Sequence, residues 1–246
     1  MNKPPIHVIL FGDPGSGKTT SAATFPKPMI VFQFDPFGKD TPYLKKGEVQ
    51  DLENDDNGTP FREIYGKKSG TLTKRIEYYH DLDPKKPGAF RRFLTRMSQF
   101  HNEYDQWATV VIDSLTFMEL CCRMNQKYHL NPTAKDGRQW YGGAKEDLEE
   151  MLMIRFAGFP MNVVINAHSS ETKDEVNGTF IRGINAVGKL GKNLPGGYGE
   201  LYRCYTGKGD DGFLWQTQKD SMWHAASQIG APNPCFPDYK MLWAEK

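Results

Sequence analysis

A glycine-rich stretch directly after an apolar run constrains this chain more than any other feature. The run Val8–Phe11 holds four apolar residues, which are typical of a buried strand. The next eight residues, Gly12–Thr19, fit the pattern G-x-x-x-x-G-K-[ST]. The backbone amides of such a loop surround phosphate groups, so the stretch predicts a nucleotide-binding loop, or P-loop, followed by a helix over about residues 17–24.

The side chains of this loop have distinct expected roles. Lys18 is placed to reach the β- and γ-phosphates, and we expect its ammonium to face solvent when no nucleotide is bound. Thr19 offers a hydroxyl to Mg²⁺. The predicted ATP-binding residues are Gly12, Asp13, Pro14, Gly15, Ser16, Gly17, Lys18, Thr19 and Thr20. The alternative is a glycine-rich turn that merely precedes a helix.

Composition and charge limit the class of protein. The 246 residues are 38% hydrophobic and 25% charged, as expected for a soluble globular chain. The net charge of +1 gives no overall field for nucleic acid, so any such binding needs a local basic patch. The four cysteines show no CxxC spacing, which favours free thiols in a reducing cytoplasm. We expect neither a signal peptide nor a membrane span.

The order of apolar runs predicts an α/β fold. Expected strands after the first are Met29–Phe34, Thr109–Ser114 and Met161–His168, and expected helices are Phe90–Phe100, Leu115–His129 and Lys145–Phe156. This alternation favours a mostly parallel sheet flanked by helices, in one domain over residues 1–246. Residues 39–87 are polar and predict an elaboration, partly loop, with one strand within Thr71–Tyr79. Near the C-terminus, Glu200–Thr206 and Phe213–Gln218 predict antiparallel strands, and Asn177-Gly178 predicts a hairpin turn.

Three polar side chains are expected at the carboxyl ends of strands, where ligands bind in parallel sheets. Asp113 follows Val110–Ile112 and fits a Walker B strand, where its carboxylate would hold Mg²⁺ opposite Thr19. The alternative is that Asp113 or the following Ser114 caps the next helix. Asp35 and His168 end two other expected strands.

The motifs Gly12–Thr20, Val110–Thr116 and Val163–His168 resemble the core of the RecA superfamily. They are most similar to compact phage-type ATP-binding proteins, the RecA-like single-strand-annealing ATPases. Trp140-Tyr141-Gly142, expected before the Lys145 helix, and Gly188–Pro195 are also similar to sequences of that group. The resemblance covers about two thirds of the chain and leaves out residues 39–87.

The resemblance implies a RecA-like P-loop NTPase core in which the His168 strand lies between the P-loop strand and the Asp113 strand. His168 would then act as a sensor beside the γ-phosphate, and the alternative is a half-exposed histidine at a strand end. RecA-like ATPases orient the attacking water with a carboxylate, commonly Glu, where this chain has Asp35. Because Asp35 is shorter than Glu, ATP binding is better supported than hydrolysis. The alternative is that Asp35-Pro36 starts a turn.

The resemblance also implies partners. Loops after the His168 strand contact DNA in RecA-like proteins, which makes Arg182, Lys189 and Lys192, with Tyr198 as a stacking group, a candidate patch for single-stranded DNA. A solvated basic loop is the alternative. A homo-oligomer, a single-strand-binding protein as partner, and a phage protein in the host cytoplasm are further expectations.

Two other functions stay open at this point. A nucleotide kinase would need an arginine-rich lid, which Arg91, Arg92 and Arg96 could imitate, although the spacing places them on the polar face of an amphipathic helix. A non-catalytic nucleotide-binding module would fit the missing Glu. The leading expectation is an ATP- and Mg²⁺-binding protein of DNA recombination, annealing or replication that hydrolyses ATP.

Overall fold

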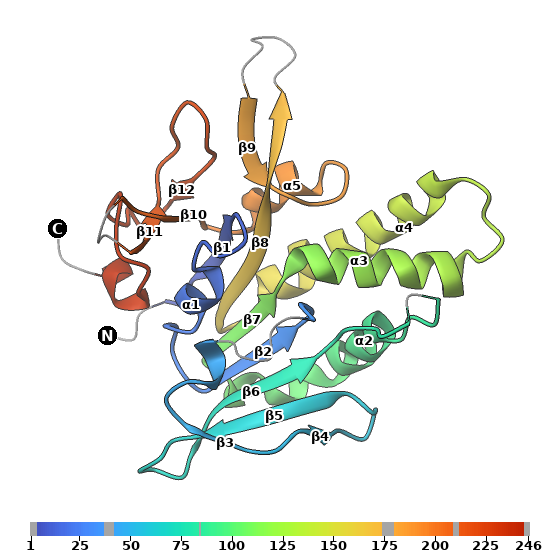
Figure 1. The fold of residues 1–246 in the computed structure, drawn as a ribbon, viewed down its shortest axis with the longest axis horizontal. Coiled ribbons are helices and arrows are strands. Elements are labelled where there is room, and N and C mark those ends of the chain that lie inside the picture. The colour runs from blue at the N-terminus through green and yellow to red at the C-terminus, as the bar shows by residue number, and fades with distance from the viewer. Residues whose placement is uncertain (1–3, 37–41, 84, 174–179, 209–211, 244–246) are drawn as a thin grey trace.

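A mixed β-sheet organises the protein, for which we use a computed structural model that describes residues 4–36, 42–83, 85–173, 180–208 and 212–243 (Figure 1). The strand order is β11-β10-β1-β8-β7-β2-β6-β5-β3. The six central strands run parallel: β10 (Glu200–Thr206), β1 (His7–Gly12), β8 (Asn162–Lys173), β7 (Thr109–Asp113), β2 (Met29–Gln33) and β6 (Leu72–Tyr78). The strand β8 lies between β1 and β7, as the resemblance implied.

Antiparallel strands extend this parallel centre. At one edge, β11 (Phe213–Gln216) and β12 (Ala226–Ser227) pair with β10. At the other, β5 (Pro60–Tyr65) pairs with β6 and carries β3 (Glu48–Val49) and β4 (Glu53–Asn54). The strand β9 (Phe180–Ile184) pairs with the end of β8 to form a ribbon that projects from the sheet (Figure 1). The predicted fold class, a mostly parallel sheet flanked by helices with C-terminal antiparallel strands, is confirmed.

Helices cover both faces of the sheet. The helix α1 (Lys18–Ala22) lies on one face, and α2 (Ala89–Gln99), α3 (Leu115–Asn125) and α4 (Gly137–Glu149) lie on the other. Successive residues of β1 alternate accordingly: Ile9 and Phe11 join the cluster of α2–α4, while Val8 and Leu10 join the cluster of α1. Burial on both faces explains why the central strands are continuous apolar runs. The remaining α-helix in the described part of the chain is α5 (Leu190–Asn193).

Short 3₁₀ and π segments complete the secondary structure. The 3₁₀ segments are Pro42–Leu44, Phe100–Gln106, Phe156–Gly158, Leu194–Gly197 and Tyr239–Trp243, and the π segments are Gln126–Leu130 and Glu150–Arg155. The two π segments continue α3 and α4, so the predicted helices over residues 115–129 and 145–156 are confirmed, although each is only partly α-helical.

The start of α4 differs from the prediction. The helix begins at Gly137, eight residues before Lys145, because the carboxylate of Asp136 accepts the backbone N–H of Arg138 at 2.9 Å and caps it. Trp140-Tyr141-Gly142 therefore lies inside the helix and not before it. Because glycine is a poor helix former, the sequence pattern did not predict the first turns of this helix. Gly143 permits close packing, since a Cβ there would lie 2.5 Å from the side chain of Gln126.

Other predicted boundaries are also corrected by the structure. The strand that was expected to end at His168 continues to Lys173. The turn predicted at Asn177-Gly178 lies outside the described residues, but the two strands that flank it pair antiparallel.

All four cysteines are free and buried. Among the described residues, no helix combines the length and apolar character that crossing a membrane requires.

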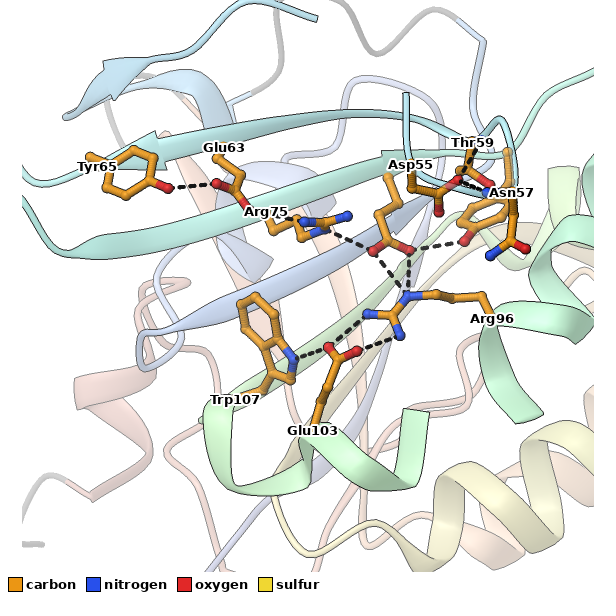
Figure 2. Close-up of polar contacts among 11 residues, drawn as sticks. Asp55, Asn57, Thr59, Glu63, Tyr65, Arg75, Arg96, Glu103 and Trp107 are labelled. Atoms are coloured by element: carbon orange, nitrogen blue, oxygen red, sulfur yellow. Dashed lines mark hydrogen bonds and ion pairs between the residues drawn. The ribbon is translucent and has the colours of Figure 1, made fainter. Parts of the chain in front are cut away.

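The polar elaboration is partly loop, as predicted, and contains three strands besides the predicted one, which is β6. It supplies β3–β6, and Glu77 of β6 is fully buried beneath α2. Arg96 of α2 reaches Glu77 at 3.1 Å and Glu103 at 2.8 Å, and Arg75 joins the same network (Figure 2). Arg96 is only 7% exposed, so the prediction that it belongs to the polar face of this helix is wrong. The buried carboxylate of Glu77 requires a cation beside it.

Candidate nucleotide-binding site

The P-loop has the strand–loop–helix context that its motif requires. The strand β1 ends at Gly12 and α1 begins at Lys18. Gly17 has φ +86°, and a Cβ there would lie 2.5 Å from the ring of Phe213. A Cβ at Gly12 would collide with the carbonyl oxygen of Cys204. Both glycines are therefore needed for the path of the loop, which is more than a generic turn before a helix.

A cavity of about 490 Å³ opens over this loop. Its lining joins the P-loop to residues from three neighbouring parallel strands or from just beyond their ends. It consists of Pro14, Gly15, Ser16, Gly17, Lys18, Thr19, Thr20, Asp35, Pro42, Asp113, Ser114, Phe117, His168 and Phe213. The structure thus brings together the four predicted catalytic residues, Lys18, Asp35, Asp113 and His168, from separate parts of the chain.

The lysine of the loop is not solvent-facing, which corrects the expectation. Lys18 is only 7% exposed, and its Nζ donates to the carbonyl oxygens of Gly12 at 2.9 Å and Asp13 at 2.8 Å. The amine folds back onto its own loop because these carbonyls are its nearest acceptors. Burial lowers the pKa of Lys18, and nearby acidic groups, including Asp113, oppose that shift. The ammonium lies at the cavity wall, where it can turn toward a phosphate.

Asp113 is held by hydroxyl groups. Its Oδ2 accepts from Thr19 Oγ1 at 2.9 Å and from the phenol of Tyr43 at 3.0 Å. Burial raises the pKa of Asp113 to about 6, against the opposing effect of these hydrogen bonds. Ser114, the N-cap residue of α3, makes no side-chain capping hydrogen bond, and the Asp113 carboxylate is engaged by Thr19 and Tyr43. The capping alternative for these residues is therefore wrong.

The oxygen atoms around Asp113 fit a magnesium ion. Gln33, Asp113 and Asn166 are register partners on three adjacent strands. Gln33 Oε1, Asn166 Oδ1 and the Oγ atom of the adjacent Ser114 are buried without a hydrogen-bond partner. Mg²⁺ prefers oxygen ligands and keeps several waters, which such atoms can accept hydrogen bonds from. Within the described ranges no cluster of three or more His, Cys, Asp or Glu could hold a metal alone, so Thr19 and Asp113 would need phosphate oxygens as further ligands.

His168 and Asp35 flank the same cavity. The backbone N–H of His168 donates to Thr116 Oγ1 at 3.2 Å, and its ring packs edge-on against Phe117. Burial, and then the charge of Lys18, lower the pKa of His168, which favours the neutral imidazole near pH 7. The backbone N–H of Asp35 donates to the carbonyl of Asp113 at 3.1 Å, which ties the end of β2 to β7.

The candidate DNA patch is brought together only in part. Lys189, the N-cap residue of α5, and Lys192, within α5, are exposed. Arg182 of β9 pairs with Glu171 at 2.8 Å and lies over the ring of Trp223. Tyr198 is only 3% exposed, and its hydroxyl donates to the carbonyl of Leu152 at 2.8 Å. The expectation that Tyr198 stacks on bases is therefore corrected, because its ring is part of the core. The sequence analysis missed Tyr43, which contacts Asp113, and the lining residues Pro42, Phe117 and Phe213, since these residues were assigned to no motif of the site.

Comparison with known proteins gives the family. The strand order, the P-loop and the aspartate of β7 define a P-loop NTPase. A family described as AAA domain matches residues 4–227, so the chain belongs to this family of AAA-domain proteins. A KaiC-like protein from the archaeon Pyrococcus horikoshii is similar in structure, with 13% identity, a TM-score of 0.43, and coverage of 94% of this chain and 89% of that chain. No curated protein matches the sequence.

Proposed function

We propose that the chain binds ATP with Mg²⁺ in the cavity over the P-loop and hydrolyses it. One observation carries the proposal: the P-loop, Lys18, Thr19 and Asp113 line one cavity, with Thr19 Oγ1 2.9 Å from Asp113 Oδ2. P-loop NTPases use these residue types, in this arrangement, for nucleotide and Mg²⁺.

Each residue has a chemical role in this proposal. The loop amides and Lys18 bind the β- and γ-phosphates, and Thr19 and Asp113 hold Mg²⁺, which neutralises phosphate charge when bound. Asp35 orients the attacking water, since it is the carboxylate at the end of β2 that lines the cavity. The neutral ring of His168 donates a hydrogen bond to the γ-phosphate.

We further propose a role in DNA recombination, annealing or replication, as a phage-type protein that acts as a homo-oligomer on single-stranded DNA, with a single-strand-binding protein as a possible partner. This part rests on the RecA-like resemblance and on the exposed Lys189 and Lys192 at α5. No observation favours a nucleotide kinase, because Arg96 is buried in an ion-pair network and is not available for a lid.

A phosphate-release assay tests the proposal and separates the alternatives. With ATP and Mg²⁺, release that rises on addition of single-stranded DNA supports the full proposal. A double variant Lys189→Ala/Lys192→Ala should lose the stimulation and keep the basal rate, while Lys67→Ala/Lys68→Ala, on the β5–β6 turn, serves as the matched control. Phosphoryl transfer to a nucleotide would support a kinase, and tight ATP binding without turnover a non-catalytic module.

A further inference from the structure

A buried tyrosine outside the P-loop and Walker B motifs contacts the magnesium site. Tyr43 lies in the 3₁₀ segment Pro42–Leu44 of the polar elaboration, and its side chain is fully buried. Its hydroxyl lies 3.0 Å from Asp113 Oδ2, the same oxygen that accepts from Thr19. The magnesium carboxylate is therefore held from two sides, by the P-loop helix and by the elaboration.

The direction of the Tyr43 hydrogen bond is fixed by its neighbours. Asn166 Nδ2 can only donate, and it lies 3.4 Å from the Tyr43 oxygen. The phenolic hydrogen is then left for the carboxylate of Asp113, which accepts it. The ring is buried in the apolar cluster that also holds Ile64 and Val111, and close packing there restrains the phenol beside Asp113.

The backbone around Tyr43 is also held in place. Lys74 of β6 is buried, and its Nζ donates to the carbonyl oxygens of Tyr43 at 2.5 Å and of Lys45 at 2.8 Å. These two bonds fasten the turn to the strand that joins the elaboration to β2. A continuous set of polar contacts thus runs from Lys74 through Tyr43 to Asp113 and Thr19.

We propose that Tyr43 is a positioning residue of the magnesium site, which orients the Asp113 carboxylate and is itself held by Lys74. This inference rests on the proposed binding of ATP with Mg²⁺. The hydroxyl of Thr19 can ligate Mg²⁺ through a lone pair of its oxygen atom, while the same hydroxyl still donates its hydrogen bond to Asp113. Tyr43 then supplies a further donor, beside the side chain of Asn166, that keeps the carboxylate in one orientation. Groups that orient a metal ligand in this way typically contribute about 10- to 100-fold to metal affinity.

The test compares two tyrosine variants that each lose one hydroxyl–carboxylate hydrogen bond. Tyr43→Phe removes the hydroxyl that faces Asp113. Tyr79→Phe is the matched control, because Tyr79 is equally buried and its hydroxyl donates to Glu77 at 2.9 Å, away from the cavity. ATP binding is titrated against Mg²⁺, and again in EDTA. A purely structural effect would change both titrations in both variants.

The expected result is a shift in Mg²⁺ dependence alone. Tyr43→Phe should need about tenfold more Mg²⁺ for half-maximal ATP binding, with unchanged affinity in EDTA, while Tyr79→Phe matches the parent. Lys74→Met, which keeps the phenol but releases the turn, should shift in the same direction. Unchanged Mg²⁺ dependence in Tyr43→Phe overturns the role of Tyr43. A parent chain whose ATP binding ignores Mg²⁺ overturns the proposed metal site and, with it, this inference.

Discussion

At the scale of single residues, Asp113 meets two opposed demands. Its burial in the ligand-free protein favours the protonated carboxyl and raises its pKa to about 6. Mg²⁺ instead requires the carboxylate. In the proposed magnesium complex Asp113 is ionised, although burial disfavours the ionised carboxylate in the ligand-free protein, as is common where binding residues are buried.

The raised pKa predicts how stability depends on pH. Between the ordinary value of 3.8 and about 6, the folded chain holds a proton on Asp113 that the unfolded chain releases. This contribution to the free energy of unfolding is fully present below pH 3.8 and is lost as pH rises through about 6. Asp113→Asn removes the ionisable group and, with it, this fall in the free energy of unfolding. The ligand-free variant should therefore be about 1–3 kcal/mol more stable than the parent at about pH 7.5, and should gain less at about pH 5.

Urea unfolding at the two pH values measures this difference. The same variant should show a weakened Mg²⁺ dependence of ATP binding, because an amide is a poorer anchor for a hard cation. A variant that is less stable than the parent at both pH values would contradict the account of burial. A magnesium titration identical to that of the parent would contradict the role of Asp113 in metal binding.

Asp35 carries a separate prediction about turnover. If Asp35 orients the attacking water, Asp35→Asn should slow phosphate release by about 10²- to 10⁴-fold and leave the affinity for ATP unchanged. The affinity serves as the internal control, since Asp35 does not hold the phosphates in this account. A variant with the turnover of the parent would assign the water to another residue.

At the scale of elements, the helix α2 shows what periodicity can and cannot predict. The spacing of Phe90, Phe93 and Met97 predicts the helix and most of its buried face. It does not predict that Arg96 is buried while Leu94 is 37% exposed. Arg96 is buried because it pairs with Glu77, which β6 places beneath the helix. The charges of Glu103 and Glu77 raise the pKa of Arg96, although its burial alone would lower it.

The buried arginine should be important for stability. Arg96→Met leaves Glu77 and Glu103 without their shared cation, and we expect a loss of about 3–5 kcal/mol in the free energy of unfolding. Arg91→Met, on the exposed side of the same helix, is the matched control and should change stability by less than about 0.5 kcal/mol. Equal losses in the two variants, measured by urea unfolding, would show that the network is not important for stability.

Some residues of the site are predicted from the sequence and others are not. The P-loop residues are predicted because their motif is local, and Asp113 and His168 because buried strands precede them. The sequence does not predict Tyr43 as a site residue, because its contacts form only when the elaboration packs against β7 and β8. The sequence does not predict β5, because Arg62 and Glu63 interrupt its apolar residues, and a strand that is only partly buried tolerates such charges.

At the scale of the whole molecule, the order of the strands brings the candidate nucleotide-binding residues together over the P-loop. Parallel strands β1, β8, β7 and β2 are neighbours in the sheet (Figure 1). Residues on these strands, or just beyond their ends, therefore line the cavity over the P-loop. The elaboration joins the same sheet through β6 and reaches the site through Tyr43. This arrangement allows residues far apart in sequence to bind one nucleotide, and we propose that residues 1–246 act as one ATP-binding domain.

The most direct test of this account is a calorimetric titration of ATP, with Mg²⁺ and with EDTA, into the parent chain and Lys18→Ala. The control is Lys27→Ala, because Lys27 also donates to backbone carbonyls, those of Ala23 and Phe25, but does not line the cavity. We predict Mg²⁺-dependent binding to the parent and to Lys27→Ala, and an affinity reduced about 100-fold in a folded Lys18→Ala. Unchanged affinity in folded Lys18→Ala would contradict the assignment of the cavity as the nucleotide site.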